Sequence, residues 1–505
     1  MSRPTGKWML VMLVILHALI VLPLAYLLNV WVDEASTLYT TSNGIVATFS
    51  NLFTNEKQAP LYFLLLSIWS SIDSSIFFAR LFSVICSLLS IIVFFRLANK
   101  IWERHDALTA SALFAFHPYL FWASLEIRLY SLVILLTCLL LNFFVDGFLS
   151  DENDETSSRK QTTAQVLYAV TASLSLYTNY YLGFPIVGGF AALLLLRRWR
   201  DAKKYFLWMS AVGVSILPLL YIVNLQFADR IANFQDEKSL TEGLRMVWNH
   251  FLTFALPSEI YAPEDQTTWS LVRLWIVRLT IVGSLIVLIK NKGRDIDKSV
   301  VFFAAIVVVS AIFLVFVYFQ LGANHIEIRH AAIYFVAIFA LVIGLMFKVV
   351  PMSYRIFAIM VLVMFYGYAL LTLYPNSVKQ GDWANVAAFV SANESPGQPI
   401  MVFPVFETVG MRAYYNGANQ VLPNDRIFSF TADGPTGTSS RHAREIPFLI
   451  SQIPADAKEF WLLTGDSCLD IEACSPLEKF VDANYTVLQE QDFYREKVRL
   501  LRKKQ

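Results

Sequence analysis

The sequence predicts a mainly α-helical protein that crosses a membrane many times and ends in an α/β domain outside the cytoplasm. Of its 505 residues, 56% are hydrophobic and 16% are charged, whereas soluble domains have roughly 45–50% apolar and 25% charged residues. Long apolar runs recur up to about residue 374, and polar, strand-length patterns follow them. The net charge of +1 gives no general attraction to nucleic acid, so a nucleic-acid partner is not expected.

The first part of the chain contains the expected transmembrane helices. About 20 mostly apolar residues are needed to cross a bilayer, and about eleven segments reach that length. They are approximately residues 8–28, 77–98, 106–122, 129–149, 164–180, 182–199, 206–225, 270–290, 299–320, 331–348 and 355–374. Residues 60–72 are apolar but short, which predicts a helix at the membrane interface.

Basic residues in short loops predict the orientation, because Lys and Arg remain on the cytoplasmic side. With the N-terminus inside, the inner loops hold eighteen Lys and Arg residues and the outer loops about nine. An odd number of spans then places the C-terminus outside. We therefore expect a plasma (inner) membrane protein with a transmembrane domain over 1–374, which includes a first outer loop at 29–76, and an extracytoplasmic domain over 375–505.

The composition of the tail predicts alternating strands and helices, which is typical of an α/β domain. The expected strands are 399–404, 426–430, 458–465, 485–490 and 497–501, and helical patterns at 407–415 and 440–453 lie between them. Cys468 and Cys474 lie in this domain, and an oxidising compartment would favour a disulfide between them.

Ionisable residues gather at three places on the predicted outer rim. Asp33 and Glu34 follow the first span, Glu126, Arg128 and Tyr130 lie in a short turn, and residues 325–330 read HIEIRH. Charges at a membrane boundary are costly, so such a cluster indicates a functional site. Each place alone also fits a solvated edge or a structural ion pair, but their common face favours a single site.

The order of several short motifs adds a resemblance to this pattern. After the Asp33–Glu34 pair come APLYFLLL at 59–66, ARLFSV at 79–84, LEIRLY at 125–130, YTNYY at 177–181, IRH at 328–330, Asp382–Trp383 and Tyr414–Tyr415. The set resembles the C-type-fold (GT-C) membrane glycosyltransferases that use polyprenyl-phosphate sugars. The most similar branch is protein-mannosyltransferase-like (glycosyltransferase family 39 in the broad sense), which includes the aminoarabinose lipid A transferases.

The resemblance implies inverting transfer of one sugar from a polyprenyl-phosphate sugar on the outer face. The acceptor hydroxyl needs a base, for which Asp33 is the first candidate, while Glu34 would position the acceptor or substitute as the base. The leaving lipid phosphate needs a fixed cation, and arginine binds phosphate bidentately. Arg128 and Arg329 are the candidates for this role.

The remaining rim residues have supporting roles in this interpretation. Glu126 and Tyr130 would hold Arg128, and Tyr181 would line the sugar or phosphate pocket. No cofactor is required; a carboxylate-rich rim, or His325, Glu327 and His330, could hold a divalent metal, but ordinary surface histidines are the simpler interpretation. The expected partners are the lipid-linked donor, membrane lipids and a glycan, lipid or protein acceptor.

Other classes of protein remain open from the sequence. A transporter or lipid flippase would place ionisable residues near the bilayer midplane and often shows repeated halves, neither of which is seen. A non-catalytic sensor or scaffold would leave the rim motifs unexplained. A polysaccharide ligase or polymerase is the closest enzymatic alternative, and the sequence identifies neither the sugar nor the acceptor.

Overall fold

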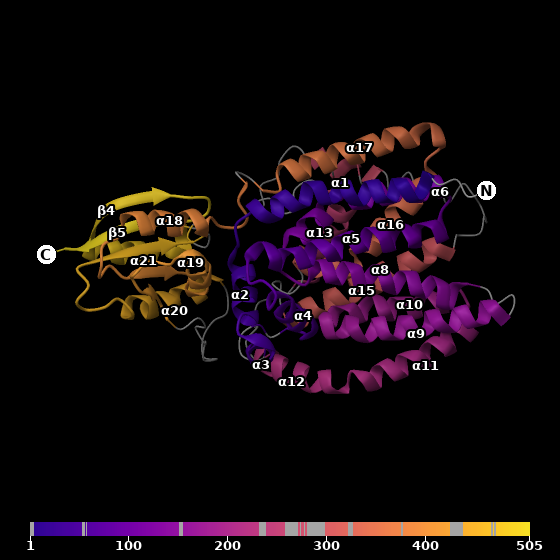
Figure 1. Ribbon diagram of the computed structural model, residues 1–505, viewed down its shortest axis with the longest axis horizontal. Coiled ribbons are helices and arrows are strands. Elements are labelled where there is room, and N and C mark those ends of the chain that lie inside the picture. Colours follow the sequence, from indigo (N-terminus) through magenta and orange to yellow (C-terminus); the bar gives the residue numbers. More distant parts are fainter. Residues whose placement is uncertain are drawn as a thin grey trace. The chain divides into compact units, whose positions relative to one another are not determined.

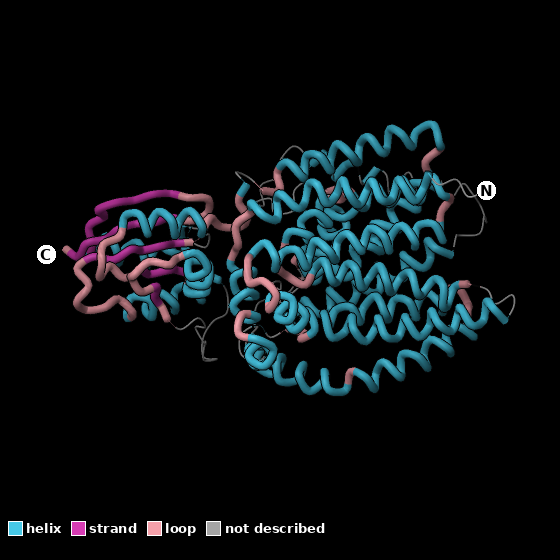
Figure 2. The backbone as a smooth tube through the Cα atoms, in the orientation of Figure 1, coloured by secondary structure: helices cyan, strands magenta, loops and turns pink. Residues whose placement is uncertain are grey.

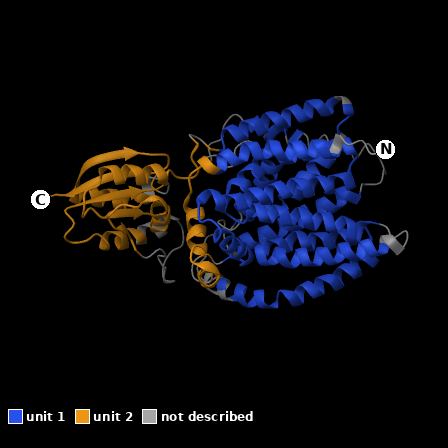
Figure 3. Ribbon diagram, viewed as in Figure 1, with its two compact units in different colours: residues 1–25, 58–228, 238–373 blue, residues 26–57, 229–237, 374–505 orange. Residues whose placement is uncertain are grey.

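The protein divides into two compact units, drawn in blue and orange in Figure 3. The computed structural model describes residues 5–52, 56, 58–150, 155–231, 239–257, 271–272, 274–276, 278–279, 298–321, 327–374, 377–424, 438–465, 468 and 471–504. Unit 1 comprises Met1–Ala25, Gln58–Ala228 and Lys238–Leu373, and unit 2 comprises Tyr26–Lys57, Asp229–Glu237 and Tyr374–Gln505.

Unit 1 is helical throughout its described part, and its helices run side by side (Figure 1). They are α1 (Thr5–Leu27), α4 (Leu61–Ser70), α5 (Ile76–Ile101), α6 (Arg104–Ala115), α7 (Pro118–Leu125), α8 (Tyr130–Phe144), η2 (Val145–Leu149), α9 (Glu155–Thr178), η3 (Tyr180–Leu182), α10 (Gly183–Leu195), α11 (Trp199–Ser215), α12 (Leu217–Ile231), α13 (Leu240–Ala255), α15 (Lys298–Leu321), η5 (Ile328–Ala331), α16 (Ala332–Val349) and α17 (Met352–Leu371).

Six helices in the described part of the chain are long and apolar enough to cross a membrane. They correspond to the expected spans 8–28, 77–98, 129–149, 299–320, 331–348 and 355–374. The expected span 206–225 is a pair of helices bent by 57°, and 182–199 corresponds to a shorter apolar helix. Helix α9 covers most of 164–180, and most of 270–290 lies outside the described residues.

The segment 106–122, expected as one span, is not one continuous helix, because the chain is broken between α6 and α7. His117 has an extended backbone (φ −66°, ψ 128°) and Pro118 begins α7. The helical region is sterically disfavoured for a residue before proline, which favours the end of a helix at this point. By contrast, the short apolar segment 60–72 forms the ten-residue helix α4, as expected from its length.

Unit 2 contains every strand of the described residues (Figure 2). Its elements are α2 (Val32–Thr41), α3 (Gly44–Asn51), α18 (Trp383–Asn393), β1 (Ile400–Phe403), η7 (Val405–Glu407), α19 (Thr408–Tyr414), β2 (Val421–Leu422), α20 (Thr438–Ser451), β3 (Glu459–Thr464), α21 (Ile471–Asn484), β4 (Tyr485–Asp492) and β5 (Lys497–Lys503). The sheet order is β2-β1-β3-β5-β4. Strand β1 is parallel to β2 and β3, whereas β5 is antiparallel to β3 and β4.

Helices cover both faces of this sheet, because successive side chains of a strand point to opposite faces. On one face, Ile400 and Trp461 pack in a buried cluster with Trp383 of α18 and Met411 of α19. On the other face, the cluster is built from α20, α21 and the alternate strand residues. The α/β character of the tail was therefore predicted correctly.

The strands agree with four of the five expected segments. Strands β1, β3, β4 and β5 lie within or overlap the expected ranges. The expected strand at 426–430 lies outside the described residues, and the described edge strand is β2 at Val421–Leu422. The helices α18 and α21 were not foreseen.

The division into units differs from the expected boundary at residue 374. Residues 26–57, which include α2 and α3, group with the tail instead of with the membrane helices. The side chain of Val32 packs against the buried cluster that contains Trp383. The start of the first outer loop is thus structurally part of the α/β unit.

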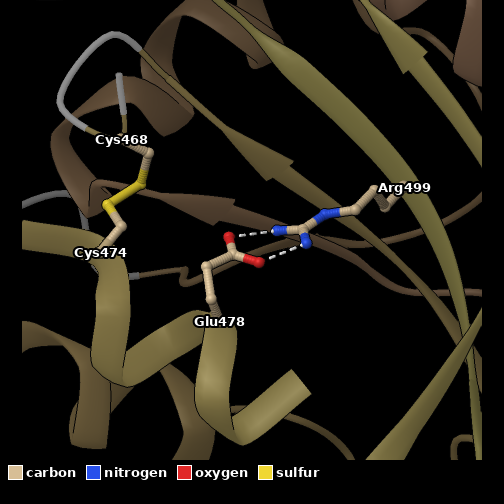
Figure 4. Close-up of a disulfide and its surroundings, with 4 residues drawn as sticks. All are labelled: Cys468, Cys474, Glu478 and Arg499. Carbon is tan, nitrogen blue, oxygen red and sulfur yellow. Dashed lines mark hydrogen bonds and ion pairs between the residues drawn. A yellow bond between two sulfur atoms is a disulfide. The ribbon is translucent and has the colours of Figure 1, made fainter. Parts of the chain in front are cut away.

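A disulfide and an ion pair lie beside each other on helix α21 (Figure 4). Cys468 is bonded to Cys474, with 5.2 Å between their Cα atoms. Glu478, four residues further along, accepts two hydrogen bonds from Arg499 of β5 at 2.6 and 2.7 Å. This bidentate pair joins α21 to the sheet.

Gly381 provides a test of the packing before α18. Its φ is +101°, and an added Cβ would lie 2.3 Å from Oε1 of Glu496, whose other oxygen accepts a 2.7 Å hydrogen bond from the Asp382 N–H. Gly381→Ala should therefore cost backbone strain of about 1–3 kcal/mol and about 1 kcal/mol more for the weakened hydrogen bond. Gly397→Ala is the matched control, since its φ is +87° with open space around it. Hydrogen exchange of the tail measures the loss of stability in both variants. Equal losses of stability would contradict the clash with Glu496.

The disulfide and the orientation can be tested together in intact cells. A membrane-impermeant thiol reagent without reduction should label neither Cys468 nor Cys474, whereas denaturation with reduction should expose these and the buried free thiols of Cys86 and Cys138. Labelling of Cys468 or Cys474 in unreduced cells would contradict the disulfide. Full protection of a C-terminal tag from external protease would contradict the orientation.

Candidate active site

Asp33 and Glu34 occupy the first turn of α2. The chain enters this helix through Trp31, whose backbone is extended (φ −99°, ψ 174°). The Trp31 N–H donates to Glu34 Oε2 at 3.4 Å, as in the second half of a capping box. Carboxylates in a first turn are also favoured by the helix dipole. These local interactions favour the start of α2 just before Asp33 and Glu34.

Glu34 is fully buried and pairs with Lys379 of the tail. The Lys379 Nζ lies 2.6 Å from Glu34 Oε1, and the two side chains are 2% and 0% exposed. This lysine was not foreseen, since a single Lys in the polar stretch before Asp382 gives no pattern to recognise. In a buried pair each charge depends on the other, because a lone buried charge is very costly.

Further hydrogen bonds fasten the residues before α2 to the tail. The Lys379 N–H donates to Asn29 Oδ1 at 2.8 Å, and the Asn29 side chain donates to the Gly381 carbonyl. The Val30 N–H donates to the Tyr414 hydroxyl. The Asp382–Trp383 and Tyr414–Tyr415 motifs thus belong to the part of unit 2 that holds the start of α2.

Asp33 differs from Glu34 in its surroundings. Its side chain is partly exposed, whereas that of Glu34 is not. The Asp33 carbonyl accepts a hydrogen bond from Thr37 at 3.0 Å within the helix. Two adjacent carboxylates therefore stand in different environments, which is the arrangement by which proteins separate the roles of paired acids.

The polar side of α2 meets a third carboxylate that the sequence analysis did not single out. Ser36 donates to Glu56 Oε1 at 3.0 Å, and Thr40 lies 3.5 Å from the same oxygen. Glu56 is 8% exposed. The hydroxyl side chains of Ser36 and Thr40 lie four residues apart in α2. This spacing is the sequence signal that could have identified the polar face of the helix.

Tyr415 of the tail is a neutral structural group. Burial and, second, a hydrogen bond to Glu394 raise the pKa of Tyr415 to about 12. Its hydroxyl donates to Glu394 and accepts from the Asn419 N–H at 2.9 Å. It stays protonated at physiological pH and holds the segment after α19.

In unit 1, the turn that carries Glu126, Arg128 and Tyr130 is buried, with exposed fractions of 2%, 6% and 4%. This turn was expected on the outer side of the membrane, and neighbouring helices cover it. Ser83 of α5 donates to the Glu126 carbonyl, and Ser131 donates to the Ala123 carbonyl, both at 2.6 Å. These bonds satisfy backbone groups that a buried turn would otherwise leave unpaired.

A chain of aromatic rings connects this turn to the segment that carries Arg329. Tyr130 stacks on Trp122 with 4.8 Å between centroids, and Trp122 lies 5.1 Å from Tyr119. The Tyr119 hydroxyl donates to the Ile328 carbonyl at 3.1 Å. The structure therefore brings the turn at 126–130 and the short helix η5 into one region of unit 1.

Arg329 and Tyr181 complete this region. The Arg329 Nε lies 2.8 Å from Glu327 Oε2, and its side chain is 24% exposed. The Tyr181 ring contacts the His330 ring edge to face, 6.2 Å between centroids. Tyr181 is held in η3 by the Asn179 side chain, which accepts from its N–H at 2.8 Å.

The predicted site residues thus fall into two sets. Asp33 and Glu34 belong to unit 2 with Lys379, and the other five belong to one region of unit 1. Within the described residues, no group of three His, Cys, Asp or Glu side chains is arranged to hold a metal ion; His325 lies outside that part of the chain. A further buried cation, Arg80, is fully covered and donates to the Ala25 carbonyl near the end of α1 at 2.8 Å.

Comparisons with known proteins agree with this architecture. Residues 57–222 match the family model of dolichyl-phosphate-mannose-protein mannosyltransferases. The apo oligosaccharyltransferase of Archaeoglobus fulgidus is similar in structure (TM-score 0.53, 12% identity, 91% of this chain and 70% of that chain). So is that organism's oligosaccharyltransferase AglB, in complex with an inhibitory peptide and a dolichol-phosphate (TM-score 0.50, 12% identity, 96% and 74%).

ArnT from Cupriavidus metallidurans in the apo state aligns over 99% of this chain and 98% of its own, with 12% identity and a TM-score of 0.49. No curated protein sequence matches the chain. Residues 57–222 therefore resemble the dolichyl-phosphate-mannose-protein mannosyltransferase family, and the chain shares the fold of the archaeal oligosaccharyltransferase.

Proposed function

We propose that the chain transfers a single sugar from a polyprenyl-phosphate sugar to an acceptor hydroxyl on the extracytoplasmic side of the plasma membrane, with inversion. The main support for this proposal is the difference in burial between the two carboxylates in the first turn of α2. Glu34 is buried against Lys379, while Asp33 is partly exposed. The dolichol-phosphate in the similar archaeal oligosaccharyltransferase supports a lipid-phosphate donor.

Asp33 acts as the general base in this mechanism. Its carboxylate takes the proton of the acceptor hydroxyl as that oxygen bonds to the anomeric carbon. The bond between this carbon and the phosphate oxygen breaks in the same displacement, and its electron pair leaves with the lipid phosphate. Attack from the face opposite the leaving group inverts the anomeric configuration.

Arg128 and Arg329 bind the donor phosphate. Growing negative charge on the leaving phosphate is stabilised by fixed cations, and more strongly where water is excluded. Arg128 is only 6% exposed, and the contacts through Tyr130, Trp122 and Tyr119 hold its turn beside η5. Glu126 and Tyr130 support Arg128, and Tyr181 lines the pocket for the sugar or the phosphate.

Glu34 has a positioning role instead of serving as a substitute base. Both of its oxygens are engaged, one by Lys379 Nζ and the other by the Trp31 N–H. A carboxylate that neutralises a buried ammonium cannot take a proton without leaving that cation uncompensated. No step of the mechanism requires a metal.

Asp33→Asn should abolish sugar transfer while leaving insertion and donor binding intact. The change is nearly isosteric and removes only the base, so turnover should fall by about 10²–10⁴-fold. The assay follows label from a polyprenyl-phosphate sugar into the acceptor fraction of membranes. Asp492→Asn, at an exposed position of β4, is the control and should keep full activity. Turnover of Asp33→Asn above about a tenth of wild type would be too high for loss of a general base.

Substitutions of Arg128 test whether this side chain binds the donor phosphate or only has a structural role. Arg128→Lys keeps the charge but loses the bidentate fork, so donor affinity and turnover should both fall. Arg128→Ala should cost more, on the order of 10²–10³-fold in turnover, because the leaving phosphate loses its counter-ion. Arg96→Lys, at an exposed position of α5, should have no effect.

The double variant Glu126→Gln with Arg128→Gln tells the two roles apart. If Arg128 only neutralises Glu126, removing both charges should restore stability and activity together. If Arg128 binds phosphate, the double variant should be folded, inactive and unable to retain polyprenyl phosphate. Recovered activity would remove Arg128 from the site.

A further inference from the structure

We infer that Lys379 is a positioning residue for sugar transfer: through Glu34 it holds the helix turn that carries Asp33, which makes the C-terminal domain part of the catalytic apparatus. This inference rests on the proposed role of Asp33. It assigns a function to the tail and to a lysine that no motif marks.

The pair formed by Lys379 and Glu34 is buried. Lys379 and Glu34 are 345 residues apart in sequence, and 2.6 Å separates their charged atoms. With exposures of 2% and 0%, water screens neither charge, so the attraction between them is much stronger than at a surface. Moving Glu34 away from Lys379 would leave two buried charges uncompensated. The position of the ammonium therefore determines the position of the carboxylate.

Hydrogen bonds hold the segment that carries Lys379 in place. The Asp382 N–H donates to Oε2 of Glu496 at 2.7 Å. Glu496 lies in the turn between β4 and β5. Gly381 has a φ of +101° and leaves no room for a side chain beside Glu496. The Lys379 N–H donates to Asn29 Oδ1 at 2.8 Å. The sheet thus positions residues 379–382, which in turn position Asn29 and Glu34.

The proposed base lies directly beside this pair in the chain. Asp33 and Glu34 are neighbours in the first turn of α2, so a displacement of one moves the other. Val32, on the other side of Asp33, packs into the core cluster of the tail. The Val30 N–H is bonded to Tyr414. Asp33 is therefore flanked on both sides by residues anchored in the tail, and a displacement of about 1 Å can cost about 10²-fold in rate.

A positioning role and a merely structural role predict different kinetics. If Lys379 and Glu34 only stabilise the fold, the properly folded fraction of a variant should turn over normally. If they position Asp33, the folded variant should show a lower kcat. Its KM for the donor should stay unchanged, because Arg128 and Arg329 of unit 1 bind the phosphate in this mechanism.

The experiment compares full-length variants in membranes. Glu34→Gln with Lys379→Met removes both charges at once, which leaves no buried uncompensated charge and no change in local net charge. Asn29→Ala removes a neutral link in the same assembly and remains informative if the double variant does not fold. Lys497→Met removes a half-exposed lysine of the same tail that pairs with Glu490 at 3.2 Å. Formation of the Cys468–Cys474 disulfide and protease resistance report the folded fraction.

We expect kcat of the folded double variant to fall by about 10²-fold, with the donor KM within about twofold of wild type, and Asn29→Ala to show a smaller loss of the same kind. Lys497→Met should match wild type. Normal kcat in the folded double variant, or in Asn29→Ala if the double variant does not fold, would overturn the inference. A change in KM alone, with kcat unchanged, would overturn it too.

Asp33→Asn is measured in parallel. If Asp33→Asn is active, the proposed base is wrong; if it is inactive while the pair variants are normal, only the role of Lys379 is wrong.

Discussion

The buried ion pair between Glu34 and Lys379 is the interaction on which the arrangement of the candidate base depends. It joins the first turn after the first transmembrane helix to a segment 345 residues later, and it does so without access to water. Because such a pair is stable only when both partners are in place, the start of α2 forms together with the tail. The grouping of residues 26–57 with unit 2 agrees with this constraint.

Unit 1 holds cationic side chains, such as that of Arg128, in a largely apolar environment. The turn at 126–130 is covered, and its backbone is satisfied by serine hydroxyls from α5 and α8. Aromatic stacking and the Tyr119 hydroxyl then bring η5 beside it. A leaving phosphate benefits from cations that are already in position and poorly hydrated, because no reorganisation is then needed as charge develops.

Sequence patterns predicted the elements that local chemistry controls. The membrane helices follow from apolar length, and β1, β3, β4 and β5 follow from short apolar runs between turns. The break at Pro118 was missed because the apolar run continues through it, although proline chemistry signals it. Lys379, Glu56 and the covering of Arg128 depend on contacts between distant segments, which no local sequence pattern encodes. Likewise, Asp33 and Glu34 look equivalent in sequence, and only burial distinguishes them.

The proposed reaction is a single displacement at the anomeric carbon, with a carboxylate base and a lipid phosphate leaving group. The most direct measurement is the anomeric configuration of the product, determined by nuclear magnetic resonance after transfer from a polyprenyl-phosphate sugar of known configuration. The account predicts inversion, with one polyprenyl phosphate released for each sugar transferred. A product that retains the donor's configuration, or transfer without release of polyprenyl phosphate, would contradict it.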